Sequence, residues 1–561
     1  MEMSEGENFL VFFLNMNKQR GIMLMSNHVD AIVIGAGFSG IYMTHKLREE
    51  GFTVKTLEKA AGVGGVWYVA RYPGARCDSD SIYYNYIFSE ELYKKWSWST
   101  RFAAQDEILS YLNFVAEELD VKKEMQFNTE VKSATWDEEQ FKWRVLTTQG
   151  EEFSATYLIS GVGCLSTSNI PDFKGRESFK GESYHTGNWP HTPVDLKGKR
   201  VGVIGTGSSG VQSIPVIAEE AKEVYVFQRT PQYSVPTRNR QFTEEEIAQF
   251  KEAFLDAREI MLNSPSGLPI PRSTKSVVDT PEEERIAILE DAWEKGGMIL
   301  NNAFYDIVID PKSNELVSEF LRNKIREKVK KSEVVEHLLP YYYYSTKRPI
   351  LDTNYHDTYN QEHVTLVNLR QQPIESITEN GVQTTEKEYR LDIIVFATGY
   401  DAMTGTLLKL DIRGRKGVSL QEKWENGAKV ETYLGLGLAG FPNFFTITGP
   451  QSPSVLTNVP TAIEQHVEWI SDCLNFLREH NVKTIEPTVE AEALWSKQCT
   501  EIANGTLFTK TDSWYTGSNI EGKSRDFLIY LGGLDNYRQL CNEVAEKGYN
   551  GYQLQYEEIK A

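Results

Sequence analysis

The sequence predicts an α/β fold with two Rossmann-like dinucleotide-binding domains and a helical insertion. Two glycine-rich turns, Gly35–Gly40 and Gly205–Gly210, each follow a short apolar run and open a stretch of helical spacing, which is the strand–turn–helix pattern of this fold. Between about residues 243 and 339, helical spacing and capping signals replace the strand patterns. A chain of 561 residues is too long for one typical core, so several domains are expected.

Composition and charge limit the class of protein. Hydrophobic residues make up 40% and charged residues 25% of the chain, which is typical of a soluble globular protein. The net charge of -20 and the pI of about 5.1 argue against nucleic acid or an anionic membrane as the main partner.

The cysteines and histidines exclude two further kinds of site. The five cysteines form an odd, scattered set without CxxC spacing, so we expect no disulfide framework and no disulfide reductase chemistry, and a reducing, cytoplasmic location. The nine histidines show no ligand spacing, and no metal site is predicted.

The N-terminal residues 1–26 are expected to form a disordered extension. Their apolar run, Phe9–Leu14, is short and follows acidic residues, whereas a secretory signal has its basic end first and a longer apolar run. A membrane span needs about 20 apolar residues, and the sequence contains no such run.

The first glycine-rich turn follows the apolar run Val29–Ile34, which is expected to be a buried strand. Gly35 permits the tight turn, Gly37 lets a pyrophosphate approach the backbone, and Gly40 lets helix and strand pack closely. The helix N-terminus then faces the phosphates. The two residues between the last glycines are Phe38 and Ser39.

The residue after the second strand supports this interpretation. Thr53–Leu57 is the expected second strand and ends at Glu58, at the distance where a carboxylate meets a ribose 2′-hydroxyl. A single GxGxxG motif is weak evidence for a nucleotide site. Here a strand precedes it, a helix follows it and Glu58 ends the next strand, and together these features indicate dinucleotide binding specifically. The first unit therefore suits a nucleotide with an unmodified ribose.

The second turn differs at the matching position. Counted from the first glycine of each turn, Gln228 takes the place of Glu58, and Arg229-Thr230 follow directly. A guanidinium pairs with a 2′-phosphate in a two-pronged manner, so the second nucleotide is predicted to be NADP(H). The alternative is a surface arginine without a role. The expected contacts in the turn itself are Thr206, Gly207, Ser208, Ser209, Gly210 and Gln212.

A glycine- and aromatic-rich region follows the first unit. Gly65-Val66-Trp67 suits a loop lying against a flat ring system, because glycine lets the backbone come close. A surface turn with a packing tryptophan is the alternative. Asp78 follows Arg76 and Cys77 in the same region, and it could equally be a salt-bridged surface acid.

The helical insertion has clear start signals. Thr243 and Glu246 form a capping-box pattern, and Pro281 is expected at the first position of a later helix. An apolar stripe recurs every four residues and is expected to be core. Its members are Val317, Leu321, Ile325 and Val329.

The last third returns to the α/β pattern. Two adjacent cations, Lys347-Arg348, precede Pro349, and Asp392–Gly399 is an apolar strand ending in glycine. A later amphipathic helix contains His466, for which a structural role is favoured over a catalytic one.

Two dinucleotide-binding units in one chain point to a flavoprotein reduced by a nicotinamide cofactor, with FAD in the first unit and NADP(H) in the second. The expected division is 1–26 extension, 27–165 and 395–561 FAD-binding domain, 166–233 and 342–394 NADP-binding domain, and 234–341 helical domain.

The stretch Phe179–Pro190 lies between the two units and indicates which family of flavoproteins the chain resembles. It has Phe179, Gly181, His185, Trp189 and Pro190 at the positions of the pattern FxGxxxHxxxW(P/D). With the two glycine-rich turns, the chain resembles the type I Baeyer–Villiger monooxygenases from about Val29 to its C-terminus. His185 is expected to lie in a linker, with a structural or hinge role.

The resemblance implies roles for particular residues. Arg348 is implied to be the main catalytic side chain beside the flavin, Asp78 to orient it, and Lys347 to hold the NADP 2′-phosphate. Trp514 resembles a tryptophan in a mobile loop that covers NADP. Further implied cofactor contacts are Gly65, Val66, Trp67, Arg76, Cys77, Tyr84, Val131 and Val459.

The implied reaction uses NADPH and O2 to convert a ketone into an ester or lactone through a C4a-peroxyflavin. The implied partners are thus a ketone and O2, with neither nucleic acid nor membrane, in a monomer or weak homo-oligomer. Two alternatives remain: a flavin-dependent N- or S-hydroxylase, and a non-catalytic flavoprotein that senses nucleotides.

Overall fold

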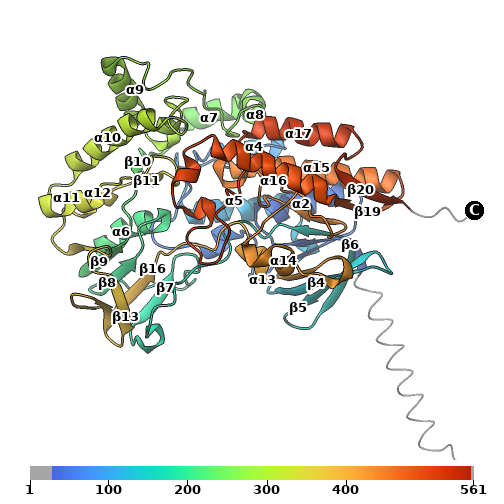
Figure 1. Ribbon diagram of the computed structural model, residues 1–561, viewed down its shortest axis with the longest axis horizontal. Coiled ribbons are helices and arrows are strands. Elements are labelled where there is room, and N and C mark those ends of the chain that lie inside the picture. The colour runs from blue at the N-terminus through green and yellow to red at the C-terminus, as the bar shows by residue number, and fades with distance from the viewer. Residues whose placement is uncertain (1–27, 557–561) are drawn as a thin grey trace, which may run out of the picture.

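The computed structural model describes residues 28–556 as an α/β protein built around two main sheets. Figure 1 shows the first sheet at the lower right, the second at the lower left, and helices along the upper side. The extension expected at residues 1–26 lies outside the described residues.

The first sheet has β1 (His28–Ile34) at its centre, with β2 (Val54–Leu57) and β6 (Glu152–Ser160) paired to it in parallel. A strand covered on both faces has a continuous apolar run, as the predicted Val29–Ile34 strand has. The other strands of the first sheet are β3 (Met125–Gln126), β4 (Val131–Asp137), β5 (Lys142–Thr147), β17 (Asp411–Arg413) and β18 (Phe444–Thr446).

The second sheet is parallel throughout, in the order β12-β9-β8-β16-β7. It contains the strand predicted before the second glycine-rich turn and the later strand that ends in glycine. Its strands are β7 (Glu182–His185), β8 (Arg200–Ile204), β9 (Glu223–Gln228), β12 (Val364–Asn368) and β16 (Ile393–Phe396).

The stretch Phe179–Pro190 was expected to be a linker, and this expectation is wrong for its first half. Glu182–His185 forms the edge strand β7, with His185 opposite Phe396 of β16. An edge strand has one neighbour only, and the first two residues of β7 are exposed, so no apolar run marked it in the sequence.

The second half of the stretch joins the two units. Trp189 is 6% exposed and packs against Tyr184 of β7, with 5.2 Å between the ring centroids. Its backbone N–H donates to the carbonyl of Val69, 3.2 Å away. Val69 ends the short helix α3 (Val66–Val69), so the expectation that Gly65-Val66-Trp67 forms a loop is wrong beyond Gly65. The stretch Phe179–Pro190 therefore connects the second sheet to helix α3 of the first unit.

Helices open at both glycine-rich turns and fill the insertion. The capping box of Thr243 and Glu246 is confirmed, whereas Pro281 lies one residue before its helix. The stripe from Val317 to Val329 is buried, as expected. The helices are α2 (Phe38–Glu49), α6 (Ser208–Glu220), α7 (Glu244–Glu252), α8 (Phe254–Leu262), α9 (Glu282–Lys295), α10 (Pro311–Lys328) and α11 (Ser332–Leu338).

Shorter elements complete these units. Trp136 and Trp143 lie opposite each other on β4 and β5, with 5.6 Å between their ring centroids. The other helices before residue 459 are α3 (Val66–Val69), α4 (Glu90–Lys95), α5 (Gln105–Glu118), α12 (Tyr355–Thr358), α13 (Gly405–Lys409) and α14 (Leu420–Lys423). The short strands are β10 (Ser234–Pro236), β11 (Ile350–Asp352), β13 (Ile374–Thr378), β14 (Gly381–Thr384) and β15 (Glu388–Arg390).

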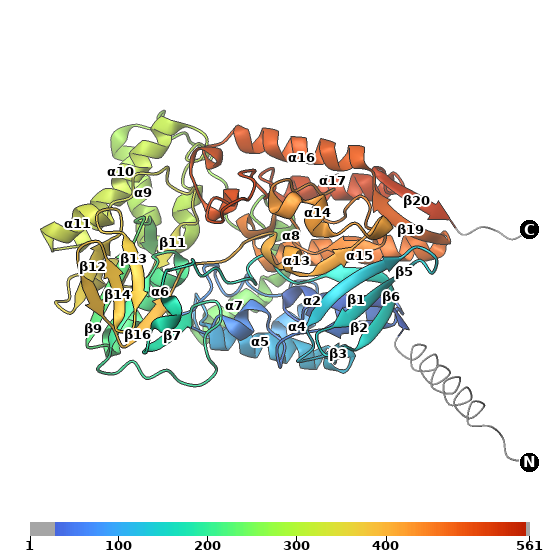
Figure 2. The same cartoon turned by 60° about the horizontal axis from the view of Figure 1, so that its bottom comes forward.

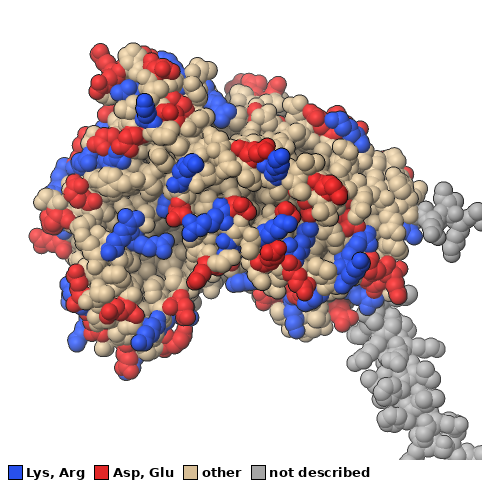
Figure 3. Space-filling view, in the orientation of Figure 1, with Lys and Arg blue, Asp and Glu red and all other residues tan. Residues whose placement is uncertain are grey.

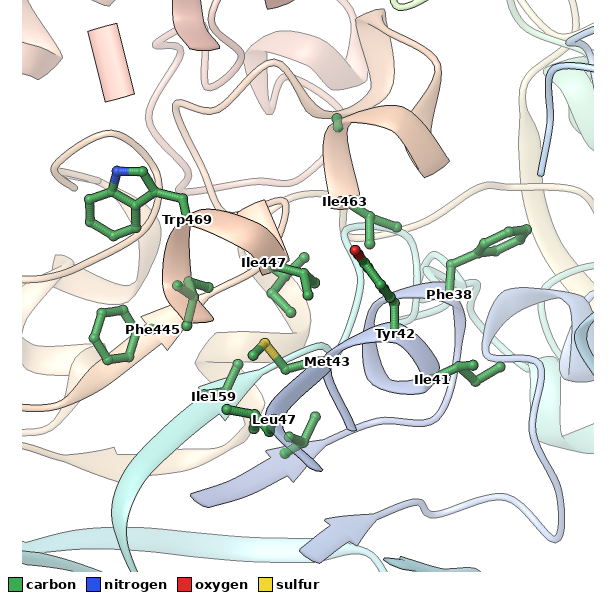
Figure 4. Close-up of a cluster of buried hydrophobic side chains, with 14 of the residues drawn as sticks. Phe38, Ile41, Tyr42, Met43, Leu47, Ile159, Phe445, Ile447, Ile463 and Trp469 are labelled. Carbon is green, nitrogen blue, oxygen red and sulfur yellow. The ribbon is translucent and has the colours of Figure 1, made fainter. Parts of the chain in front are cut away.

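The long helix α15 (Val459–Glu479) packs on α2, beside the first sheet (Figure 2). Figure 4 shows Ile463 of α15 next to Phe38 and Tyr42 of α2. None of the helices within residues 28–556 is both long and apolar enough to cross a membrane. The remaining elements are β19 (Val482–Pro487), α16 (Val489–Asn504), α17 (Leu534–Glu546) and β20 (Tyr552–Tyr556).

The interface between α15 and α2 buries a carboxyl group. Glu464 is 1% exposed, and its Oε1 accepts a hydrogen bond from the backbone N–H of Ile87, 2.6 Å away. Burial raises the pKa of Glu464 well above its ordinary value, and Glu468 adds to this effect, while the N–H of Ile87 and the Arg258 cation oppose it. The folded protein therefore binds a proton at Glu464 more tightly than the unfolded chain does.

This pKa shift predicts a pH effect on stability. The contribution of Glu464 is fully present below its unfolded pKa and is lost as pH rises through its folded pKa. Glu464→Gln keeps the acceptor but cannot ionise, so its free energy of unfolding should fall less between pH 5 and 8 than that of the parent, as urea titrations would measure. Glu479→Gln, at an exposed position of the same helix, is the control. Parallel pH dependences for parent and Glu464→Gln would contradict the prediction.

Candidate active site

The first glycine-rich turn has the close backbone packing that its glycines predict. Gly35 has a φ of +102°, and a Cβ atom at position 40 would lie 1.8 Å from the carbonyl oxygen of Gly35. A Cβ atom at Gly37 would lie 3.3 Å from Cα of Gly65. The turn and Gly65, at the start of α3, therefore face each other without side chains between their backbones.

Glu58 lies beside this turn, at the end of β2. It is 6% exposed; its Oε2 accepts from the N–H of Ala36 and its Oε1 from the N–H of Ala60, each at 2.7 Å. Two backbone donors thus fix the carboxylate where the sequence predicts a ribose-binding acid. Val131 packs in the same hydrophobic cluster as Ile34 and Leu57, the last residues of β1 and β2.

Arg348 and Asp78 form a two-pronged ion pair, although 270 residues separate them in the sequence. Nε of Arg348 lies 2.5 Å from Oδ2 of Asp78, and Nη2 lies 2.8 Å from Oδ1. Nη1 donates to the carbonyl of Val455, in the loop before α15. The guanidinium is therefore held in one plane by two segments of the chain.

The ion pair fixes the charge of both groups. Burial alone would lower the pKa of Arg348, but the Asp78 carboxylate outweighs it and raises that pKa above its ordinary value. Burial alone would raise the pKa of Asp78, but Arg348 lowers it. About a quarter of each side chain, 27% and 24%, is accessible, while the neighbouring Cys77 and Tyr84 are buried. The charged pair is thus partly accessible although these neighbours are buried.

Tyr515 is a neighbour of this pair that sequence reasoning missed. Its side chain is 1% exposed and lies close enough to Arg348 for that cation to act on its pKa. Burial raises the pKa of Tyr515 to about 12, despite the opposing effect of Arg348. The predicted Trp514 is adjacent, with 4.3 Å between the two ring centroids. The aromatic loop was visible in the sequence, but no local signal distinguishes which ring meets the arginine.

Aromatic residues line the approach from the first turn. Nε1 of Trp67 donates to the hydroxyl of Tyr84 at 3.0 Å, and the Tyr84 ring lies edge-on to Phe38, with 5.3 Å between centroids. Nδ2 of Asn458, the residue before Val459, donates to the carbonyl of Tyr83 at 2.7 Å. The structure therefore brings these predicted flavin contacts to one region between the first turn and the start of α15.

The second turn repeats the first but leaves more space. Gly205 has a φ of +108°, and a Cβ atom at Gly210 would lie 2.4 Å from the carbonyl oxygen of Gly205. A Cβ atom at Gly207, by contrast, would meet no described atom within 4 Å. The backbone at Gly207 is open to a ligand. Ser208 and Ser209 begin α6 directly after it.

Gln228 occupies the position that corresponds to Glu58. It is 2% exposed, and its Nε2 donates to the carbonyl of His337 at 2.7 Å. Its Oε1 is buried without a hydrogen-bond partner among residues 28–556. A neutral amide therefore occupies this position.

Three cations converge beyond the ends of β9 and β12. Burial lowers the pKa of Lys347, and the nearby Arg229 and Arg370 cations lower it further. Arg370 was not predicted; it follows Asn368, which pairs with Gln228 in the sheet. No carboxylate within residues 28–556 lies at ion-pair distance from Arg229, Arg370 or Lys347. Such an unpaired cluster is suited to an anion.

Gln212 links this second unit to the first. Its Oε1 accepts from the hydroxyl of Tyr72 at 2.7 Å, and its Nε2 donates to the carbonyl of Arg76 at 3.2 Å. Thr206 donates to the carbonyl of Thr230 at 3.1 Å and so fixes the segment after Arg229. The predicted residues of the two units therefore meet at one junction, where Arg76 leads to Asp78.

Lysines and arginines alternate with acidic side chains over the face in Figure 3, without forming a single band.

Comparison with known proteins agrees with this geometry. Residues 29–241 match the family model "Flavin-binding monooxygenase-like". A Baeyer-Villiger monooxygenase of Pseudooceanicola batsensis is 43% identical over 93% of this chain and 95% of its own length. The phenazine N-monooxygenase PhzNO1 of Lysobacter antibioticus is also 43% identical, over 94% of this chain and 97% of its own.

Among solved structures, cyclohexanone monooxygenase from Rhodococcus sp. Phi1 bound to NADP+ superimposes with a TM-score of 0.92 at 42% identity, covering 95% of this chain and 100% of that chain. The sequence and the fold agree over nearly the whole length. The chain belongs to the Baeyer–Villiger branch of the flavin-binding monooxygenases, whose cofactors are FAD and NADP(H).

Proposed function

We propose that this protein uses NADPH and O2 to convert ketones into esters or lactones. The observation that supports it most is the ion pair of Arg348 and Asp78, placed at the junction of two dinucleotide-binding units. A fixed, partly accessible cation is suited to a negative charge that develops on oxygen during the reaction.

The described residues fit both cofactors. The facing glycines 37 and 65 let a flat or extended ligand approach the backbone, and Glu58 provides a buried carboxylate for an unmodified ribose. In the second unit, Gly207 leaves space for a pyrophosphate, and Arg229 and Lys347 are suited to a 2′-phosphate. We assign FAD to the first unit and NADP(H) to the second.

Bound FAD, once reduced by NADPH, would supply the activation of O2. Arg348 stays protonated across any working pH, because Asp78 raises its pKa. Asp78 and Val455 use three of the five N–H groups of Arg348. The other N–H groups are left for oxygen atoms of the reacting groups, so the cation is oriented before substrate binds.

We also propose the boundaries of the units and the setting in which the protein works. The FAD-binding domain would comprise residues 27–165 and 395–561, the NADP-binding domain 166–233 and 342–394, and the helical domain 234–341. All five cysteines are unpaired, which agrees with a reducing, cytoplasmic location. We expect a monomer or weak homo-oligomer, measurable by sedimentation.

The direct test is a panel of linear and cyclic ketones with purified enzyme, NADPH and O2. Products with the mass of the ketone plus one oxygen atom, formed with matching NADPH consumption, are expected. The second candidate is N- or S-hydroxylation, favoured by the 43% identity to a phenazine N-monooxygenase. Amines and sulfides in the same panel separate the two, because oxygenation of these substrates without any ketone product would overturn the proposal.

The cation cluster predicts the nucleotide preference. Arg229→Ala should raise the KM for NADPH roughly tenfold or more, because a hydrogen bond to a charged group contributes about 1.5–3 kcal/mol. The KM for NADH, which lacks the 2′-phosphate, should change little. Steady-state kinetics with both nucleotides would measure the difference, and equal changes would contradict the assignment. Arg238→Ala, which removes an arginine paired with Glu294 instead, is the control.

A further inference from the structure

The run Tyr341–Tyr344 lies just before Lys347-Arg348, and its members have different surroundings. Tyr341 is 71% exposed, and Arg322 lies over its ring at 5.3 Å. Tyr344 is fully buried, and Asn314 donates to its carbonyl at 3.0 Å. Tyr342 is the member that faces the cation cluster, with Nζ of Lys347 lying 4.9 Å from the centre of its ring.

The hydroxyl of Tyr342 contacts the other phosphate-facing segment. It donates to Oε1 of Gln232 at 2.9 Å and accepts from the backbone N–H of Tyr233 at 3.2 Å. Gln232 and Tyr233 come soon after Arg229-Thr230 in the sequence, with only Pro231 between them. One side chain therefore links the segment that bears Arg229 to the segment that bears Lys347.

An aromatic partner suits Lys347 better than a carboxylate would. Arg229 and Arg370 repel the Lys347 ammonium, whereas Asp512 attracts it. Asp512 is itself paired with Arg525. The face of an aromatic ring attracts a cation without neutralising it or occupying its three N–H donors. Lys347 is therefore held in place while its donors stay available for a phosphate.

We propose that Tyr342 is a positioning residue that presents Lys347 to the 2′-phosphate of NADPH and holds the segment that bears Arg229 close to Lys347. The proposal rests on the 2′-phosphate site of the proposed function. Tyr342 would thereby contribute to the preference for NADPH over NADH without touching either nucleotide through its own polar groups, which are already used.

The test compares Tyr342→Leu, Tyr342→Phe and Lys347→Met in the holoenzyme, with steady-state kinetics in NADPH and NADH. Tyr342→Leu removes the ring and should raise the KM for NADPH about tenfold, with the KM for NADH and the kcat at saturating NADPH close to parental values. Tyr342→Phe keeps the ring and should show a smaller increase, about threefold, from the lost hydroxyl contacts. Tyr341→Leu, one residue away on the exposed side, is the matched control.

A double variant decides whether Tyr342 acts through Lys347. In the Lys347→Met background, Tyr342→Leu should add much less to the KM for NADPH than it does alone. Fully additive effects, or equal effects on both nucleotides, would overturn the proposal. If Tyr342→Leu does not fold, the same comparison made with Tyr342→Phe decides it: a KM change equal for NADPH and NADH overturns the proposal.

The Lys347 and Tyr342 variants separate an error in the 2′-phosphate site from an error in the role of Tyr342. If Lys347→Met leaves the preference for NADPH intact, the 2′-phosphate site itself is wrong. If Lys347→Met abolishes the preference and both Tyr342 variants retain it, the site stands and only the role of Tyr342 is refuted.

Discussion

Arg348→Ala is expected to give a folded, yellow protein that forms ester or lactone at a rate roughly 10²–10³-fold lower or not at all, because it loses the oriented cation at the reacting oxygen atoms. FAD should remain bound, since the first glycine-rich turn and Glu58 do not contact Arg348. Product mass from a ketone, together with the ratio of flavin to protein, would measure both parts of this result.

A second ion pair provides the control for Arg348→Ala. Nε of Arg101 lies 2.5 Å from Oδ1 of Asp80, and the two side chains are 16% and 24% exposed. Arg101→Ala therefore removes a comparable ion pair from a neighbouring segment and should retain ester formation. Arg348→Lys keeps the charge but loses the two-pronged geometry, so its activity should stay far below that of the parent. Normal oxygen insertion by Arg348→Ala would refute the assignment of the catalytic residue.

Gly40→Ala is expected to abolish FAD binding. Its Cβ atom would lie 1.8 Å from the carbonyl oxygen of Gly35, a distance that only a shift of the helix or of the turn can relieve. Either shift removes the backbone N–H groups from the phosphates they are placed to bind. The purified variant should be colourless or insoluble, as flavin absorbance relative to protein would show.

A glycine in the second unit is the matched control for Gly40→Ala. Gly207 has a φ of -74°, and a Cβ atom there meets no described atom within 4 Å. Gly207→Ala should therefore keep its FAD and its thermal midpoint, while the KM for NADPH rises because the methyl group occupies space meant for the pyrophosphate. Full FAD binding by Gly40→Ala would contradict the steric argument for the first unit.

Much of the fold could be predicted because its signals are local. The strand His28–Ile34 is apolar throughout because it is covered on both faces, and Gly35, Gly37 and Gly40 follow it at fixed spacing. The capping box of Thr243 and Glu246 forms within four consecutive residues. The edge strand Glu182–His185 could not be predicted in this way, because a strand with one neighbour and an exposed start has no such apolar run.

Some residues of the candidate site likewise have local sequence signals, and others do not. The sequence by itself determined the two nucleotide-binding turns, the acid at Glu58 and the neutral Gln228 with its following arginine, since each depends on spacing within one strand–turn–helix unit. The pairing of Arg348 with Asp78 was implied by resemblance to a family, and periodicity alone does not indicate it.

Only the tertiary structure decided which distant side chains meet. The proximity of Tyr515 to Arg348, of Arg370 to Lys347 and of the Tyr342 ring to Lys347 depends on the order of strands in the second sheet and on how the C-terminal loops return to it. Local sequence patterns record which residues share a strand or a helix face, whereas the distances between separate segments are set by the packing of whole elements.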